Sequence, residues 1–460
     1  MTPAGPATNR ASGASAPVAQ PADPSRLPRH LGTWNAALVL VTFTVGVGIL
    51  QSPGVVAGKT GSVPLAFLAW VAGAVAALCG ALVMAELAVR TPRSGGTTVF
   101  LNHAFGPRVA FLFGWTSMFL NPVAAAAITI VSTRNLGQIM GLGAGAQTLL
   151  GLCWVGGIMV LNMVSSRTVA WLTGGAGVFK IGALAAVVAL CFSADAPAGA
   201  GAAGAPPAEQ ALLVGFGLAV VAAMFAYDGW DGLALVAGEV REPRRTLPRA
   251  TLLGMGLILG VYLAVNLGFF HALTLGEVAA SPALAATAMG RVLGEGAAKF
   301  VTAFVAASAA STVFSSLLCN PKIAFALAEE GHFFRAVAWV HPRWKTPVVA
   351  IAIYGTMMLL YIASGSGFER LTRYMILGYL PFYGLVALGA VRLRRRQPIA
   401  PGQYAMPLYP LPVAGLLLYV ACGLASGALG DPVAAAGGVV ILVAGALVFE
   451  VRRRLFTPTG

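Results

Sequence analysis

The stretch Gly46-Val47-Gly48-Ile49-Leu50-Gln51-Ser52-Pro53 interrupts an apolar segment at residues 35–56. A second interruption, Phe225-Ala226-Tyr227-Asp228-Gly229-Trp230-Asp231-Gly232, falls within the apolar segment at residues 212–240. A helix that breaks at membrane depth exposes N–H and C=O groups that lipid cannot satisfy, so such breaks survive only where they line a cavity or hold a ligand. Two breaks in matched positions are typical of the binding site of a secondary transporter.

The composition is that of a membrane protein. The 460 residues are 58% hydrophobic and only 10% charged, whereas soluble domains carry about 25% charged residues. A net charge of +14 would suit a nucleic-acid-binding protein, but the Lys and Arg residues cluster at the ends of apolar segments, as in cytoplasmic loops. We therefore expect no nucleic-acid partner. Solvated loop charge is sufficient to explain the basic clusters, and a specific lipid site is the alternative.

Apolar stretches of spanning length, about 20 residues, recur along most of the chain. The basic residues lie mainly in the loops on one side, which predicts that both termini are cytoplasmic and that the chain crosses the inner or plasma membrane an even number of times. The sequence predicts twelve spans, at roughly residues 34–58, 64–89, 108–135, 146–164, 168–192, 212–240, 250–273, 297–327, 347–364, 372–392, 411–428 and 433–451.

The interrupted spans are the first and the sixth, so they begin two halves of five spans each. An odd number of spans inverts the second half relative to the first and places both breaks at the bilayer midplane. We therefore predict an all-α membrane protein with a 5+5 inverted-repeat core in which helices 1 and 6 are unwound. The predicted divisions are a disordered cytoplasmic tail at residues 1–32, the core at 33–396, and helices 11–12 with a cytoplasmic C-terminus at 397–460.

The chemistry of the two breaks is complementary. Gly46 and Gly48 leave backbone N–H groups free at the positive end of the half-helix that follows, which attracts a carboxylate. Free carbonyls at residues 224–227 accept hydrogen bonds from an ammonium group, so the pair suits a zwitterion such as an α-amino acid. Glycines that merely permit close helix packing are the alternative, and it fits one break better than two matched ones.

Four groups of motifs resemble a known family. They are the first break; Ala85-Glu86-Leu87 with Pro92-Arg93-Ser94-Gly95-Gly96; residues 225–231 with Arg241-Glu242-Pro243 and Leu247-Pro248-Arg249-Ala250; and Glu330-Gly331-His332 with His341-Pro342-Arg343. These are similar to motifs of the amino acid–polyamine–organocation superfamily, particularly its L-type amino acid transporter branch. The resemblance covers roughly residues 34–396, and residues 225–231 are its most specific part.

This resemblance implies a LeuT-like fold, alternating access, and amino acid transport, usually by exchange and without sodium. By position, Gly46, Val47 and Gly48 would hold the substrate carboxylate. Phe225 would be the aromatic gate over the substrate, and the carbonyls near it, at Phe225, Ala226 and Tyr227, would receive the α-ammonium. Residues 137–147 contain no cysteine, unlike animal members that attach there to a heavy chain, so no disulfide-linked subunit is expected.

Lys180 lies within the apolar run at residues 178–190, where a charged side chain is costly and indicates a function. Its candidate partners on span eight are Ser311, Thr312, Ser315 and Ser316. The resemblance implies that a lysine on helix 5 replaces a sodium ion that bridges helices 1, 5 and 8. Snorkelling of the ammonium to the cytoplasmic interface is the alternative.

Acidic residues leave the charge of the substrate open. Asp228 at the second break could select a cationic side chain, orient the α-ammonium, or cap the next half-helix; capping is favoured for Asp231. Glu86 and Glu239 are expected to form structural ion pairs with loop arginines.

The leading interpretation is a sodium-independent amino acid exchanger, with a proton-coupled amino acid or amine permease as the alternative. A channel would need rings of like charge or repeated carbonyl loops, and a non-transporting sensor would need a signalling domain; the sequence shows neither. It also lacks a P-loop, an HExxH motif and a nucleophile-elbow serine. The chain is therefore not expected to be an enzyme or to use a catalytic residue, a metal or a cofactor.

Overall fold

The computed structural model describes residues 31–46, 48–91, 96–164, 176–193, 209–235, 237, 240–281, 283–329, 331, 333–399 and 404–456. Within these ranges the regular structure is helical, apart from an isolated bridge between Leu31 and Val240. Residues 1–30 of the predicted N-terminal tail, as well as Val47 and Glu239, lie outside the described residues.

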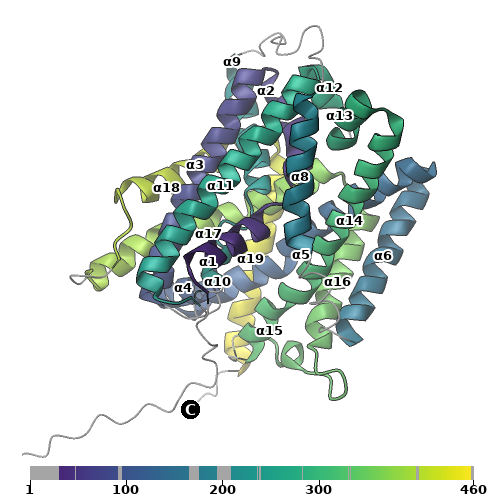
Figure 1. Ribbon diagram of the computed structural model, residues 1–460. Helices are drawn as coiled ribbons and strands as arrows, with labels where there is room; N and C mark the ends of the chain where they lie inside the picture. Colours follow the sequence, from purple (N-terminus) through teal and green to yellow (C-terminus); the bar gives the residue numbers. More distant parts are fainter. Residues whose placement is uncertain are drawn as a thin grey trace, which may run out of the picture.

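The longer helices reflect the apolar segments of the sequence, and shorter ones connect them (Figure 1). Their bounds are α1 Thr33–Thr44, α2 Gly48–Thr60, α3 Val63–Arg90, α4 Gly96–Phe105, α5 Pro107–Met140, α6 Ala144–Val164, α8 Ala176–Phe192, α9 Glu209–Ala226, α10 Gly232–Leu235, α11 Pro243–Ala272, α12 Leu275–Ala280, α13 Leu284–Leu293, α14 Glu295–Cys319, α15 Pro321–Glu329, η2 Arg335–Ala338, α16 Val348–Ala363, α17 Phe368–Arg396, α18 Leu411–Gly430 and α19 Pro432–Phe456.

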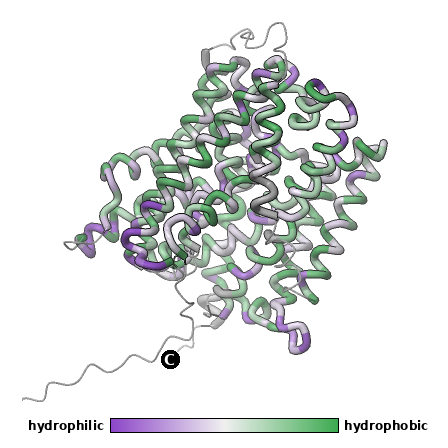
Figure 2. The backbone as a smooth tube through the Cα atoms, in the orientation of Figure 1, coloured by the Kyte–Doolittle hydropathy of each residue, from purple (hydrophilic) through white to green (hydrophobic). Residues whose placement is uncertain are grey.

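Eight helical segments in the described part are long and apolar enough to cross a membrane, and α1 with α2 makes a ninth when the bent pair is one span. The other predicted spans coincide with the shorter apolar helices α8, α9 and α16. The count of twelve therefore stays a prediction. Figure 2 shows the apolar character running along the helices, with hydrophilic residues gathered at their ends and in the loops.

The helices pack around one extensive apolar core, to which α1, α3, α9, α11 and α17 contribute. Among the closest pairings, α1 and α3 both lie against α11, α2 lies against α9, and α5 lies against α14 and α17. A smaller core at the α15 end of the molecule joins Phe111 of α5 to Phe333 and Val337 in the loop after α15. The large core holds both interrupted helices.

A helix ends at each of the two glycine-centred stretches. The first helix stops at Thr44 and α2 starts at Gly48, with a bend of 55° between them. Likewise α9 stops at Ala226 and α10 starts at Gly232, with a turn at residues 227–231. Gly229 in this turn has φ of +104°, a conformation that favours glycine because it lacks a Cβ.

Three helices between the spans, α4, α12 and α13, were not anticipated from the sequence. A further interruption separates α14 from α15 at Asn320, inside the span predicted at residues 297–327. Pro321 supplies its physical cause, since proline has no N–H to donate to the preceding turn.

Candidate functional site

The two interruptions face each other in space. A Cβ built on Gly48 would lie 2.7 Å from the Cα of Ala226. The first turn of α2 therefore touches the end of α9 backbone to backbone, and only glycine allows this approach. Segments far apart in the sequence are thus in direct contact.

A second contact joins the other halves of the same two helices. A Cβ on Gly229 would lie 3.0 Å from the carbonyl oxygen of Phe43, and one on Gly232 would lie 3.1 Å from the Phe43 ring. The turn of the second interruption therefore packs on the last turn of α1. The two contacts thus join α2 to α9 and α1 to the turn before α10.

Tyr262 of α11 joins the ends of both interrupted helices. Its hydroxyl lies 3.0 Å from the carbonyl oxygen of Thr44 and 2.7 Å from that of Ala226. These carbonyls belong to the last turns of α1 and α9, where helices leave acceptors without an intrahelical donor. The side chain is fully buried, and one hydroxyl proton serves both acceptors. The sequence analysis missed this residue because a tyrosine in an apolar span looks like packing.

Aromatic neighbours fix the ring of Tyr262. Trp70 of α3 contacts it edge-on with centroids 5.9 Å apart, and the Tyr227 ring lies 5.0 Å away. The Tyr227 hydroxyl in turn donates to the carbonyl of Trp70 at 3.2 Å. The side chain of the predicted site residue Tyr227 thus binds to α3 through Trp70.

Gly46 stands beside open space. No heavy atom lies within 4 Å of a Cβ built on it. It lines a pocket with about 360 Å³ of empty space, part of it open to the surroundings, together with Val45 and Leu50 and with residues of α8, α13 and α14. Ser308 of α14 supplies the polar lining and the other lining side chains are apolar. The first break thus opens on a cavity lined by protein.

Phe225, the second-last residue of α9, is buried where α9 packs against α17. Its ring meets that of Phe368, the first residue of α17, edge to face with centroids 5.3 Å apart. The predicted acceptors beside it are partly used: the carbonyl of Phe225 accepts the N–H of Asp228 at 3.3 Å, and that of Ala226 accepts from Tyr262. Each carbonyl oxygen keeps a second lone pair for a ligand.

Asp228 and Asp231 lie close enough to interact electrostatically with each other. The carboxylate of Asp231 bonds the Thr97 hydroxyl of α4, and that of Asp228 accepts the N–H of Gly229. Neither forms an ion pair within the described part of the chain. Asp231 directly precedes α10, and its carboxylate reaches α4.

Lys180 belongs to α8, but its side chain lies outside the described residues, as does that of Ser315.

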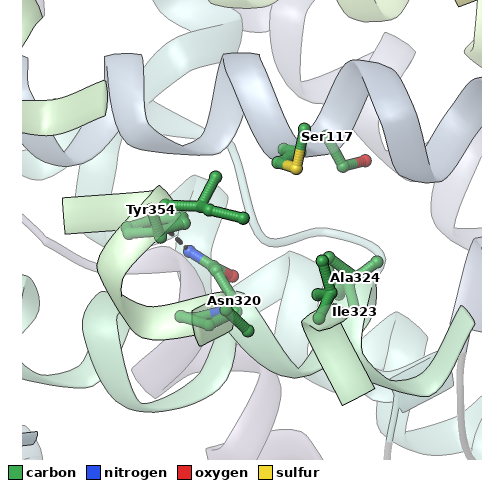
Figure 3. A pocket seen from close by; sticks show the side chains of 10 residues that line it. Ser117, Asn320, Ile323, Ala324 and Tyr354 are labelled. Carbon is green, nitrogen blue, oxygen red and sulfur yellow. Dashed lines mark hydrogen bonds between the residues drawn. The ribbon is translucent and has the colours of Figure 1, made fainter. Parts of the chain in front are cut away.

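A second pocket lies near Ser316, another predicted partner of Lys180. The Ser316 side chain forms a hydrogen bond with the hydroxyl of Tyr354 on α16. Figure 3 shows the pocket beside this bond, where the Asn320 amide donates to Tyr354 at 3.0 Å. This second pocket, with about 280 Å³ of empty space, lies where Pro321 interrupts the span.

Charged groups join helices at both ends of the molecule. At one end the buried carboxylate of Glu86 on α3 accepts from Arg90 Nε at 3.1 Å, from Arg394 Nε of α17 at 2.7 Å, and from the N–H of Met406 at 2.9 Å. These ion pairs confirm the structural role predicted for Glu86. Burial, followed by the nearby carboxylate, raises the pKa of Tyr404 in the adjoining loop to about 12.

At the other end an ion network crosses three elements. The Lys59 ammonium of α2 lies 2.9 Å from Glu369 of α17, and Glu369 also pairs with Arg373. Arg373 reaches Asp431, between α18 and α19, at 2.6 Å. Phe368, which contacts Phe225, is the residue directly before Glu369 in the chain, so this contact adjoins the ion network. Here α2, α9 and α17 are held together.

In an all-helical membrane protein, two helix breaks that meet backbone to backbone are typical of membrane transporters. The match to a family model is consistent with that class: the model for "Amino acid permease" matches residues 31–447. The chain belongs to this amino acid permease family.

Individual relatives agree with this assignment. The chain is 26% identical over 403 residues to the serine/threonine exchanger SteT of Bacillus subtilis, covering 84% of this chain and 87% of SteT. It is 28% identical over 374 residues to the human b(0,+)-type amino acid transporter 1, covering 80% and 76%. Against the human Asc-type amino acid transporter 1 it is 28% identical over 436 residues, covering 92% and 82%.

Among solved structures, the fold is similar to the inward-facing conformation of Mhp1. The TM-score is 0.54 at 17% identity, with 94% of this chain and 93% of that chain covered. At this identity the similarity concerns the fold alone.

Proposed function

We propose that this chain is a sodium-independent exchanger of amino acids that works by alternating access. The observation that carries the proposal is the meeting of the two interrupted helices at Gly48 and Ala226, with Tyr262 bonded to both. A helix start and a helix end placed against each other offer donors and acceptors within the span of one small zwitterion. Relatives named as exchangers and amino acid transporters support the same substrate class.

In this proposal the N–H groups at Gly46, Val47 and Gly48 bind the substrate carboxylate at the positive end of α2. The second lone pairs of the carbonyls at Phe225, Ala226 and Tyr227 accept from the α-ammonium, and the Asp228 carboxylate adds negative charge on that side. The Phe225 ring covers the bound molecule where it packs on Phe368.

The ammonium of Lys180 takes the place of a coupling cation, with Ser315 and Ser316 of α14 as its partners. A fixed positive charge between the first interruption and span eight would hold the bundle without sodium. The helices form twelve spans, with helices 1–10 as a 5+5 inverted repeat at residues 33–396 and helices 11–12 in the remainder. Both termini face the cytoplasm, and no heavy chain is attached by a disulfide.

Proton-coupled uptake is the second candidate, because Asp228 and Asp231 stand side by side without an ion-pair partner in the described residues. Two neighbouring carboxylates readily share one proton. In that case, the proton would bind beside the second interruption and travel with the substrate.

Proteoliposomes distinguish the two candidates. An exchanger takes up radiolabelled amino acid only when the vesicles contain unlabelled amino acid, and replacing sodium by choline leaves the rate unchanged. A symporter accumulates substrate in empty vesicles when the outside is made acidic. Uptake into empty vesicles driven by pH would overturn exchange, and absence of both activities for all twenty amino acids would overturn amino acid transport.

A further inference from the structure

The loop between α15 and α16 carries exposed aromatic and basic side chains together. Phe334, Trp339, Val340 and Trp344 are 43%, 47%, 41% and 37% exposed. Three basic residues, Arg335, Arg343 and Lys345, are interleaved with them and are exposed as well, and residues 333–347 include no acidic residue. We refer to these seven side chains as the aromatic–basic surface.

The described part of the loop is held to the rest of the molecule by contacts on its inner side. Its inner side is held by Phe333 and Val337, which are buried in the smaller core, with the Phe333 ring 5.6 Å from Phe111. His341 organises its tip: the Nδ1 atom accepts the N–H groups of Arg343 and Trp344 at 3.3 and 3.2 Å. A loop fixed in this way has no folding need for large apolar groups on its outer side.

Stacking keeps the two indoles in place. The His341 ring lies parallel to that of Trp344, with centroids 4.1 Å apart, and edge-on to that of Trp339 at 5.5 Å. Trp339 and Trp344 are therefore presented next to the charges of Arg343 and Lys345. Indoles combine an apolar body with a polar N–H and gather at the level of lipid headgroups.

We propose that the aromatic–basic surface binds the headgroups of anionic phospholipids. The loop connects α15 to α16 and extends beyond both helices at the α15 end of the molecule (Figure 1). In this proposal it therefore lies at the depth of the headgroup layer. Its three positive charges complement a negatively charged surface, and its aromatic groups enter the boundary between headgroups and acyl chains. The inference does not depend on transport or on the identity of the substrate.

The test is a titration of the purified full-length protein, in a neutral detergent, with short-chain phosphatidylglycerol or phosphatidylcholine, followed by thermal unfolding. We expect phosphatidylglycerol to raise the melting temperature at lower concentration than phosphatidylcholine. The variant R335Q/R343Q/K345Q should bind phosphatidylglycerol more weakly by about fivefold for each charge removed.

A matched control is R244Q/R245Q/R249Q, which removes three exposed arginines from the start of α11. It should keep the phosphatidylglycerol effect. Equal losses in both triple variants would mean a nonspecific response to net charge, and no loss in R335Q/R343Q/K345Q would assign this surface to another partner, such as a protein; either result overturns the proposal. In liposomes, brominated phosphatidylglycerol should quench a tryptophan component that disappears in W339F/W344F, and unchanged quenching would also overturn it.

Discussion

The Tyr262 hydroxyl lies 2.7 Å from the carbonyl oxygen of Ala226, the last residue of α9. The same hydroxyl reaches the end of α1 at Thr44. One side chain of α11 therefore connects the end of α1 to the end of α9.

Tyr262→Phe removes this donor and leaves two buried carbonyls without it. We expect a loss of about 1–3 kcal/mol in stability and a larger fractional loss in exchange, because the two binding half-sites lose their common support. Thermal unfolding and proteoliposome exchange measure the two effects. Tyr361→Phe on α16 is the matched control and should change neither; equal behaviour of the two variants would refute the role given to Tyr262.

Gly48→Ala should separate the two interruptions. Its Cβ would meet backbone of Ala226 at 2.7 Å, and backbone cannot rotate away as a flexible side chain can. We expect exchange to fall by at least tenfold, measured as initial rate. The control Gly256→Ala lies on α11, where no heavy atom is within 4 Å of a built Cβ. An active Gly48→Ala protein would show that this approach is dispensable.

Lys180→Ala should abolish exchange, whereas Lys180→Arg should retain it, because the proposal needs a fixed positive charge on α8. Rates in proteoliposomes, with amounts of folded protein checked by gel filtration, give the answer. Loss in both variants would instead favour a titrating lysine and proton coupling.

The two ion networks differ in how deeply their glutamates are buried, and we expect their loss to affect stability differently. Glu86 is fully buried, and Glu86→Ala leaves Arg90 and Arg394 without their counter-ion, so we expect destabilisation of about 3–5 kcal/mol. Glu369 is 42% exposed, and Glu369→Ala should cost less than about 1 kcal/mol. Denaturation of both variants in one detergent tests the ranking; a reversed order would contradict it.

A pH effect is expected at the α12 end. Hydrogen bonds from the N–H and hydroxyl of Thr274, assisted by Arg291, lower the pKa of Glu277 from its ordinary value of 4.5. A lowered folded-state pKa stabilises the protein above that ordinary value, and this contribution is lost as the pH falls through the lowered pKa. Thr274→Ala should reduce the acid sensitivity of the melting temperature, by a small amount because Glu277 is exposed. Parallel pH profiles of both proteins would exclude the effect.

The sequence pointed to both stretches because glycine and polar residues break an otherwise continuous apolar pattern. A helix ends at each of them, at Thr44 and at Ala226, and the unwinding of helices 1 and 6 stays a prediction. The sequence placed the ion-pair role of Glu86 correctly, but Arg394 lies 308 positions away, and no local pattern could select it among the loop arginines. Tyr262 was missed because its function depends on how α11 is rotated against α1 and α9. The break at Asn320-Pro321 could have been predicted, because a proline stands at that position. The helices α4, α12 and α13 are too short or too polar to be recognised as spans from the sequence.

The N–H of Met406 donates to the carboxylate of Glu86, although the two residues fall on opposite sides of the division predicted after residue 396. A Cβ on Gly217 of α9 would lie 1.9 Å from Ser426 Oγ of α18, so α18 packs closely against α9 as well. Cutting the chain after α17 would thus strip a buried acid of a donor and uncover the back of α9. We therefore expect a chain truncated after α17 to be less stable than the full chain, so that these helices count as part of the folded core.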